Sequence, residues 1–197
     1  MHKLVIASHN QGKVKEIQEI LEGLPLEIIP IGLYPGFIMP EEDGKTFTAN
    51  AVKKAQAVAG FTGEMSLADD SGLEVLALNR EPGVLSARYA GEDCDPQANN
   101  RLLLEKMKDI PRHQREAQFR CVIALAIPSG KTYTVEDSCQ GLITESPEGE
   151  FGFGYDPLFF YIPASRTFAA MSAEEKNLVS HRGKAMRKIR KLLEELL

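Results

Sequence analysis

The chain has little cysteine, no long apolar run and no excess of positive charge, and each of these absences excludes a class of protein. Its three cysteines, Cys94, Cys121 and Cys139, are scattered and form no CxxC pair. This argues against a disulfide framework or a zinc site and favours a reducing compartment. No apolar run approaches the roughly 20 residues of a membrane span, and we expect no signal peptide. A protein with a net charge of -5 is a poor nonspecific binder of nucleic acid. We therefore expect a cytoplasmic protein that binds neither membrane nor nucleic acid.

The remaining composition is typical of a single globular domain. The 197 residues contain 43% hydrophobic and 26% charged side chains, which suits one well-buried core. No internal repeat or low-complexity segment is present. We therefore expect one domain that spans residues 1–197.

Apolar spacing and turn residues predict the order of helices and strands. Strands are expected at residues 3–8, 26–29 and 66–69, and helices at 11–22, at 46–59 and from Asp95-Pro96. A strand cluster follows at 117–127, 131–137 and 158–162, then helices that start at the capping box Ser172–Glu175 and at Ser180. Residues 30–44 form a long loop, which in a compact domain favours a functional role. This order indicates an α/β fold with a mixed sheet.

The stretch Asp69-Asp70-Ser71-Gly72 is the most informative in the chain. It is expected to follow a short buried strand and to turn sharply at Gly72. Two adjacent carboxylates at such a place are costly to desolvate unless a metal or a reaction needs them. One can hold a divalent cation while the other orients or deprotonates a water, and Ser71 can donate a hydrogen bond to an anion. The same four residues also suit an ordinary turn.

The turn Ser8-His9-Asn10-Gln11-Gly12-Lys13 has the features of an anion site. Asn10 is placed as an N-cap, which puts Lys13 in the first helical turn. A positive charge there opposes the helix dipole, at a cost of up to about 1 kcal/mol. An anion bound at the helix N-terminus would remove this cost. The spacing of a Walker A loop is absent, and the alternative is a solvated lysine on an ordinary turn.

Two loop segments carry residue types suited to a nucleotide. Magnesium typically binds one or two carboxylates plus substrate phosphates. Glu42, one of the three loop acids Glu41-Glu42-Asp43, would bind magnesium together with Asp70 if the fold brings the two side chains together. Farther along, Gly152 and Gly154 bracket Phe153 and expose its ring for stacking on a base, and Asp156 can accept hydrogen bonds from a heterocycle. Solvated acids and a tight turn are the alternatives.

A second helix start also places cations against the helix dipole. Ser180-His181-Arg182 begins the last helix, and Lys176 reinforces its charge. Two such violations, both in contexts that suit ligand contact, favour a functional explanation. The other basic residues of that helix are expected to form its solvated face.

Taken together, these segments resemble the inosine/xanthosine triphosphate pyrophosphatase family, whose members remove deaminated purine nucleotides from the cellular pool. The resemblance runs nearly end to end and rests on SHNQGK, EEDGKTFTANAVKKA, LADDSGLEV, PGVLSARYAG, GFGYDPLF and EEKNLVSHRGKA, in this order. It implies hydrolysis of ITP, dITP and XTP to the monophosphate and pyrophosphate, which keeps these nucleotides out of DNA and RNA. It also implies a long mixed sheet flanked by helices, two lobes around a nucleotide-binding cleft, a homodimer and Mg²⁺ as cofactor.

The resemblance further implies a role for each candidate residue. Glu42 and Asp70 would bind Mg²⁺, Asp70 would also be the base for the attacking water, and Asp69 is a candidate second acid. The residues implied to contact the substrate are Ser8, His9, Asn10, Gln11, Gly12, Lys13, Lys54, Ser71, Phe153, Gly154, Tyr155, Asp156, Lys176, His181 and Arg182. Ser8, Asn10, Lys13 and Lys54 would hold the triphosphate. Phe153 would stack on the base, and Asp156, Lys176, His181 and Arg182 would contact its edge.

The base edge offers a chemical reason for selectivity. Inosine and xanthosine carry a 6-keto acceptor where adenine has a 6-amino donor, so donors from His181 and Arg182 would be left unpaired against adenine. Guanine shares the keto group, and its exclusion requires poor accommodation of its 2-amino group.

Two alternative functions stay open. A related pyrophosphatase for modified pyrimidine nucleotides would share the strategy without needing the Ser180-His181-Arg182 segment. A nucleotide sensor or RNA-binding module on the basic last helix would show salt-sensitive nucleic-acid binding without turnover. The acidic net charge and the paired carboxylates oppose this second alternative.

Overall fold

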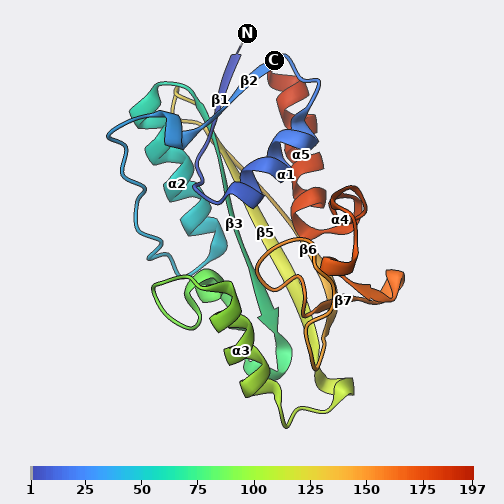
Figure 1. The fold of residues 1–197 in the computed structure, drawn as a ribbon. Coiled ribbons are helices and arrows are strands. Elements are labelled where there is room, and N and C mark those ends of the chain that lie inside the picture. Colours follow the sequence, from blue (N-terminus) through green and yellow to red (C-terminus); the bar gives the residue numbers. More distant parts are fainter. Residues whose placement is uncertain (1) are drawn as a thin grey trace. The chain divides into compact units, whose positions relative to one another are not determined.

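The computed structural model describes residues 2–197 and contains an eight-stranded sheet in the order β2-β1-β3-β5-β6-β7-β8, with β4 paired to β3. β1 pairs in parallel with β2 and β3, whereas β4 on β3, β7 on β6 and β8 on β7 are antiparallel. The predicted mixed α/β fold is therefore confirmed (Figure 1). The strands are β1 (His2–Ile6), β2 (Leu26–Pro30), β3 (Met65–Val75), β4 (Glu81–Pro82), β5 (Glu116–Ala126), β6 (Thr132–Ile143), β7 (Phe159–Tyr161) and β8 (Arg166–Thr167).

The helices begin where the predicted caps place them. Asn10 accepts a hydrogen bond from the backbone of Lys13, Asp95 caps the helix that starts with Pro96, and Ser172 forms a complete capping box with Glu175. Each cap satisfies backbone N–H groups that the first helical turn leaves without partners. The helices are α1 (Gln11–Leu21), α2 (Phe47–Thr62), α3 (Pro96–Met107), α4 (Ala173–Val179) and α5 (His181–Leu196). Among the described residues, every helix is too short or too polar to span a lipid bilayer.

The chain divides into two compact units, each assembled from separate segments. Unit 1 comprises residues 1–70, 121–137 and 182–197, and unit 2 comprises residues 71–120 and 138–181. The long strands β3, β5 and β6 each contribute residues to both units. The expected single domain and the expected cleft stay predictions.

Unit 1 has a core between α1, α5 and one face of the strands. Buried residues of α1 and α5 pack on alternate residues of β1, β3 and β5, and α2 lies on the other side of these strands (Figure 1). The spacing of apolar residues at three and four positions turns one stripe of each helix toward the sheet. The residues of this core include Leu4, Val14, Ile17, Leu67, Ile123, Met186 and Ile189.

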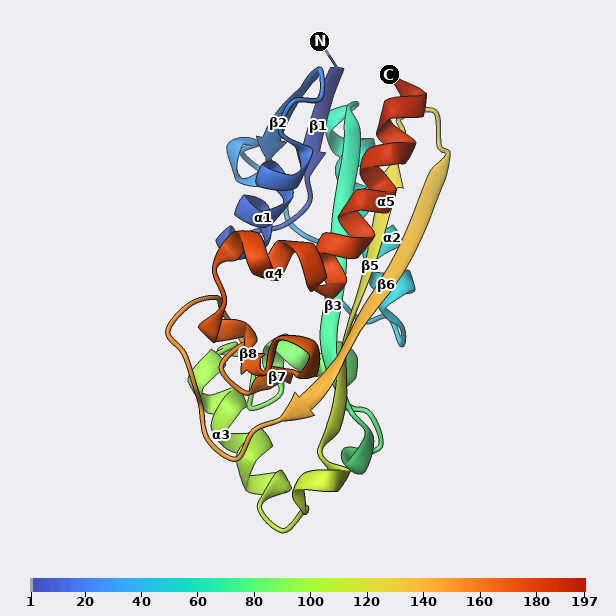
Figure 2. The same ribbon diagram turned by 90° about the vertical axis from the view of Figure 1, so that its right-hand side faces the viewer.

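Unit 2 has a separate, aromatic core. Leu103 and Met107 of α3 pack together with residues of β3, β5, β6 and β7, and Figure 2 shows α3 near β7 and β8. Phe119, Phe159 and Phe168 lie with ring centroids 4.7–5.9 Å apart in this core. Such contacts fix the orientation of the rings as well as burying apolar area.

The predicted turn at Gly72 is wrong. β3 runs without interruption from Met65 to Val75, so Asp69 and Asp70 lie in the middle of a strand. The strand continues because Leu73 and Val75 are fully buried in the core of unit 2, and the N–H of Leu73 donates to Oγ of Ser86 at 2.9 Å. The nearly continuous burial of β3 outweighs the local turn preference of the Asp-Ser-Gly sequence.

Candidate active site

The turn before α1 is held in one conformation by its own side chains. Oγ of Ser8 accepts a hydrogen bond from the N–H of Asn10 at 3.2 Å, and Oδ1 of Asn10 accepts one from the N–H of Lys13 at 3.1 Å. His9, Asn10 and Gln11 are exposed. The segment thus presents a helix N-terminus to solvent, as an anion site requires.

The side chain of Lys13 has an anionic partner within the protein. Its ammonium forms an ion pair with Oδ1 of Asp69, whose side chain is fully buried. The expected conflict with the helix dipole is therefore partly relieved by the protein itself, and this pairing was not anticipated from the sequence.

A lysine and two carboxylates converge in unit 1. Nζ of Lys54, on α2, lies 2.5 Å from Oε1 of Glu42 and 3.3 Å from Oδ1 of Asp70, and it also donates to the backbone carbonyl of Asp69 at 2.9 Å. Glu42 and Asp70 therefore lie close together, as the predicted magnesium site requires. Although burial opposes the charged form, the carboxylates of Asp70 and Glu42 raise the pKa of Lys54.

The acidic loop reaches this place because Gly44 is anchored to α2. The N–H of Gly44 donates to Oδ1 of Asn50 at 2.8 Å, and a Cβ on Gly44 would lie only 2.4 Å from that oxygen. A side chain at position 44 would push the loop away from the helix. Asn50, which the sequence interpretation did not single out, is thus a residue that positions Glu42.

Asp70 and Asp69 have opposite electrostatic environments. Burial raises the pKa of Asp70, against the lowering effects of Lys54, Lys13 and the amide of Asn50. Oδ2 of Asp70 is buried and has no hydrogen bond of normal geometry among residues 2–197. Burial would also raise the pKa of Asp69, but Arg182 and Lys13 hold it well below its usual range. Asp70 is therefore the carboxylate with free acceptor capacity.

This arrangement fits a hard divalent cation. In the described part of the chain, no three His, Cys, Asp or Glu side chains form a metal-binding group. Two carboxylates and the phosphates of a substrate are nevertheless a normal ligand set for magnesium. Glu42 and Asp70 both contact the same nitrogen of Lys54, and the second oxygen of Asp70 is available.

The aromatic loop of unit 2 is built around Asp156. Its Oδ2 accepts hydrogen bonds from the N–H of Phe153 at 2.8 Å and from Nζ of Lys176 at 2.6 Å. The same ammonium lies 4.6 Å from the centroid of the Phe153 ring, within the range of a cation–π contact. Gly152 and Gly154 both have positive φ, which allows this tight loop.

His181 is held by an aromatic ring that the sequence interpretation missed. Its imidazole is 4% exposed and stacks on Phe119 of β5, with ring centroids 4.6 Å apart and planes inclined by 10°. The sequence predicted a strand at residues 117–127 but gave no sign of this contact.

Three other candidates lie in less expected surroundings. Tyr155 is buried, and its hydroxyl donates to the carbonyl of Ser86 at 2.9 Å, so its side chain belongs to the core of unit 2. Ser71 lies in β3 and is half-buried. The guanidinium of Arg182 is buried in unit 1, where it bonds carboxylates of the protein. The substrate contacts of all three stay predictions.

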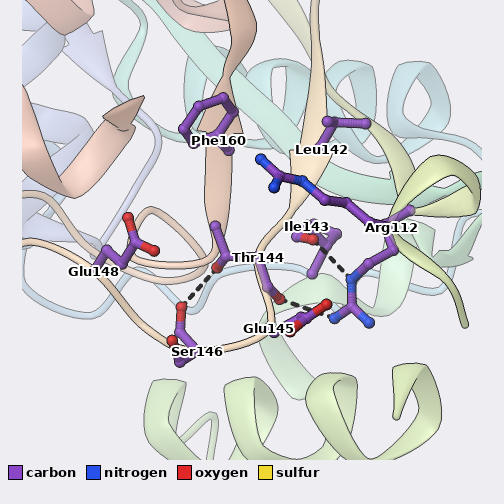
Figure 3. Close-up of a pocket in the computed structure, with 9 residues that line it drawn as sticks. Arg112, Leu142, Ile143, Thr144, Glu145, Ser146, Glu148 and Phe160 are labelled. Atoms are coloured by element: carbon purple, nitrogen blue, oxygen red, sulfur yellow. Dashed lines mark hydrogen bonds between the residues drawn. The ribbon is translucent and has the colours of Figure 1, made fainter. Parts of the chain in front are cut away.

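A separate cavity in unit 2 involves none of the predicted site residues. It has a volume of about 240 Å³ and lies beside the end of β6 (Figure 3). Arg115 closes one side by donating to the carbonyls of Ile143 and Thr144, both at 2.8 Å, and to that of Met107 at 2.8 Å. These bonds tie the end of α3 to β6, which is a structural role.

Comparison with known proteins finds relatives that align with nearly the whole chain. A sequence model described as the Ham1 family matches residues 4–192. The chain is 53% identical over 194 residues to a dITP/XTP pyrophosphatase of Desulforamulus reducens, with 98% of this chain and 96% of the relative aligned. It is 47% identical to a dITP/XTP pyrophosphatase of Bacillus subtilis, with 98% of each chain aligned.

Solved structures agree with the sequence comparison. The Ham1 protein of Staphylococcus aureus superimposes with a TM-score of 0.88 at 41% identity, covering 99% of this chain and 100% of that one. A HAM1 protein of Coxiella burnetii gives a TM-score of 0.90 at 39% identity with the same coverage. The fold is thus that of the Ham1 proteins. The chain belongs to the Ham1 family.

Proposed function

We propose that this protein hydrolyses the deaminated purine nucleoside triphosphates dITP, ITP and XTP to the monophosphate and pyrophosphate, with Mg²⁺ as cofactor. The relatives from Desulforamulus reducens and Bacillus subtilis are named dITP/XTP pyrophosphatases. The structural observation that carries the proposal is the convergence of Glu42 and Asp70 on Lys54, with one buried oxygen of Asp70 left without a protein partner. Such an enzyme would keep these nucleotides out of DNA and RNA.

Asp70 is assigned as the base of the reaction. The carboxylate of Asp70 accepts a proton from water, the water oxygen attacks the α-phosphorus, and the bond from that phosphorus to the bridging oxygen breaks. Pyrophosphate leaves with the electron pair. Because burial raises the pKa of Asp70, its carboxylate is a stronger base than an exposed one.

The charged groups of unit 1 are assigned to the triphosphate. Lys13 and Lys54 supply positive charge, and Ser8 and Asn10 shape the exposed start of α1. Bound Mg²⁺, held by Glu42 and Asp70, would supply further charge stabilisation for the leaving pyrophosphate. Fixed positive groups are effective here because phosphoryl transfer depends mainly on positioning and electrostatics.

The polar and aromatic groups of unit 2 are assigned to the base. Phe153 offers a ring for stacking, while Lys176 and His181 offer donors for a 6-keto oxygen. Asp156 keeps Lys176 and the backbone of Phe153 in place. Adenine would present a donor to these donors, and the unpaired groups would weaken its binding.

A homodimer, a cytoplasmic location and the lack of nucleic-acid binding stay predictions alongside this assignment.

The test is pyrophosphate release from dITP, ITP, XTP, GTP and ATP, with and without Mg²⁺. We expect strong Mg²⁺-dependent release from the first three and little from GTP or ATP. Release of orthophosphate instead would show that the assigned bond is wrong. Absence of turnover with all five would favour modified pyrimidine nucleotides or a nucleotide sensor.

A further inference from the structure

Asp69 is the centre of a buried charge cluster in unit 1. Its Oδ1 pairs with the ammonium of Lys13, and its Oδ2 accepts hydrogen bonds from Nε of Arg182 at 3.1 Å and from Sγ of Cys121 at 2.9 Å. A carboxylate offers about four lone-pair sites, and both oxygens of Asp69 are already used by protein donors. Asp69 is therefore a counterion inside the protein, with little capacity left for a metal or a water.

Arg182 connects this carboxylate to α1. Nη2 also approaches Oδ1 of Asp69 at 3.4 Å, and Nη1 donates to Oε2 of Glu16 at 2.5 Å. The side chain of Arg182 is 3% exposed, so it makes these contacts away from solvent. All three guanidinium nitrogens thus bond carboxylates. Glu16 and Lys13 lie three positions apart on α1, which places them on one face of that helix.

The charges of the cluster balance. Lys13 and Arg182 are opposed by Asp69 and Glu16 in three ion pairs. Without Arg182, Lys13 would face an excess of negative charge, and the attraction of this site for a polyanion would fall. The planar guanidinium of Arg182 bonds Asp69 and Glu16 at the same time, so its loss would release both Asp69 and the first turns of α1 from α5.

We propose that Arg182 is a positioning residue that acts through Asp69 and Glu16 to hold the ammonium of Lys13 in place for the triphosphate. This inference rests on the proposed function, because it takes Lys13 to contact the phosphates. It gives Asp69 the role of a counterion in place of a second acid. It also gives the side chain of Arg182 a task in phosphate binding in place of contact with the base edge.

The informative variant is Arg182→Lys. Lysine keeps the charge, but its compact ammonium cannot bond both carboxylates as a planar guanidinium does. We expect the KM for dITP and the inhibition constant of pyrophosphate each to rise about tenfold, which corresponds to about 1.4 kcal/mol. We expect the ratio of kcat/KM for dITP and dATP to stay unchanged. A fall in this ratio with unchanged pyrophosphate inhibition would overturn the proposal and return Arg182 to the base edge.

Arg190→Lys is the matched control. Arg190 also belongs to α5 and also anchors α1, but it donates to the carbonyls of Ile20 and Glu22 at the opposite end of that helix. We expect both constants to stay within about twofold of the wild-type values in this variant. An equal rise in the two variants would mean that general loosening of α1, and not the placement of Lys13, is responsible, and would overturn the proposal.

A double-mutant cycle tests whether the effect passes through Lys13. In a Lys13→Met background, Arg182→Lys should change the pyrophosphate constant by less than about twofold. A full tenfold effect in that background would overturn the proposal. If Arg182→Lys does not fold, as judged by circular dichroism, Glu16→Gln replaces it, with an expected rise of about threefold because this partner is less buried. An unchanged constant in folded Glu16→Gln would contradict the proposal.

The two proposals fail in different ways. If the wild-type protein releases no pyrophosphate from dITP, the proposed function is wrong. Binding of pyrophosphate itself, measured by calorimetry on wild type and variants, then still decides whether Arg182 controls anion binding at Lys13.

Discussion

Nζ of Lys176 lies 2.6 Å from Oδ2 of Asp156, and both side chains are at least 95% buried. Burying an ion pair is unfavourable unless further hydrogen bonds satisfy the charges. The carboxylate receives such a bond from the N–H of Phe153, and the ammonium lies against the Phe153 ring. The pair therefore fixes the loop that carries the aromatic side chain, and its integrity depends on the space left by Gly152.

Gly152→Ala should destabilise this loop strongly. A Cβ at position 152 would lie 2.2 Å from Oδ2 of Asp156, and φ of +76° is itself unfavourable for alanine. The left-handed conformation alone costs about 1–2 kcal/mol, and the steric conflict adds to it. Urea unfolding should show a larger loss in Gly152→Ala than in Gly154→Ala.

Gly154 is the matched comparison for this variant. Its φ is +62°, but a Cβ there would meet nothing within 4 Å. Gly154→Ala therefore reports conformational strain without the collision. Equal losses of unfolding free energy in the two variants would show that the contact with Asp156 has no energetic weight.

Asp70→Asn should abolish turnover and leave the fold intact. Removing a general base typically costs about 10²–10⁴-fold in rate. One oxygen of the buried Asp70 carboxylate has no hydrogen-bond partner among the described residues, and burial disfavours its charged form. The neutral amide of asparagine should therefore not lower the melting temperature in metal-free buffer. Mg²⁺ should raise the melting temperature of the wild type but not of the variant.

The control for Asp70→Asn is Asp43→Asn, which removes an exposed acid of the nearby loop that pairs only with Lys53 among the described ion pairs. It should retain wild-type turnover. Full activity of Asp70→Asn would eliminate its assignment as the base.

Phe153→Leu should raise the KM for dITP. Stacking of a base on an aromatic ring contributes about 1–3 kcal/mol, so a rise of at least about fivefold is expected, with a smaller change in kcat. Phe151→Leu is the control because Phe151 lies in the same loop but is 65% exposed and faces solvent. Indistinguishable steady-state constants for the two variants would exclude stacking on Phe153.

Tyr155 should make the protein sensitive to alkaline pH. Burial, together with the nearby Tyr89, raises the pKa of Tyr155 above its usual value, so the folded protein keeps a proton that the unfolded chain loses above about pH 10. Stability is therefore fully present below that pH and falls as the pH rises, by up to about 1.4 kcal/mol per pH unit.

Tyr155→Phe isolates this effect. At neutral pH it should cost about 0.5–1.5 kcal/mol through loss of the hydrogen bond to Ser86. Between pH 10 and 11 its unfolding free energy should decline less steeply than that of the wild type in guanidinium titrations. Parallel declines would mean that Tyr155 ionises in the folded state as it does in the unfolded chain.

Local signals in the sequence predicted much of the fold. The caps at Asn10, Asp95 and Ser172 were correct because a cap needs only the residues of its own first turn. The order of the helices and of the longer strands, and with it the mixed sheet, followed from apolar spacing, whereas the two-residue strands β4 and β8 were not predicted. The end of β3 was wrong because turn preference is local, whereas the burial of Leu73 and Val75 depends on the distant residues of the second core.

The sequence by itself determined that two adjacent carboxylates, two lysines and an aromatic loop belong to one chain of α/β type. Only the tertiary structure decided which carboxylate does what. Neighbouring residues of a strand point to opposite faces of the sheet, so Asp69 meets Lys13 and Arg182, whereas Asp70 meets Lys54 of α2. Those partners lie between 16 and 113 residues away in the sequence from the carboxylates that they bond. They also belong to different helices. No local pattern encodes which helix covers which face, and that packing makes one aspartate a buried counterion and leaves the other with a free oxygen.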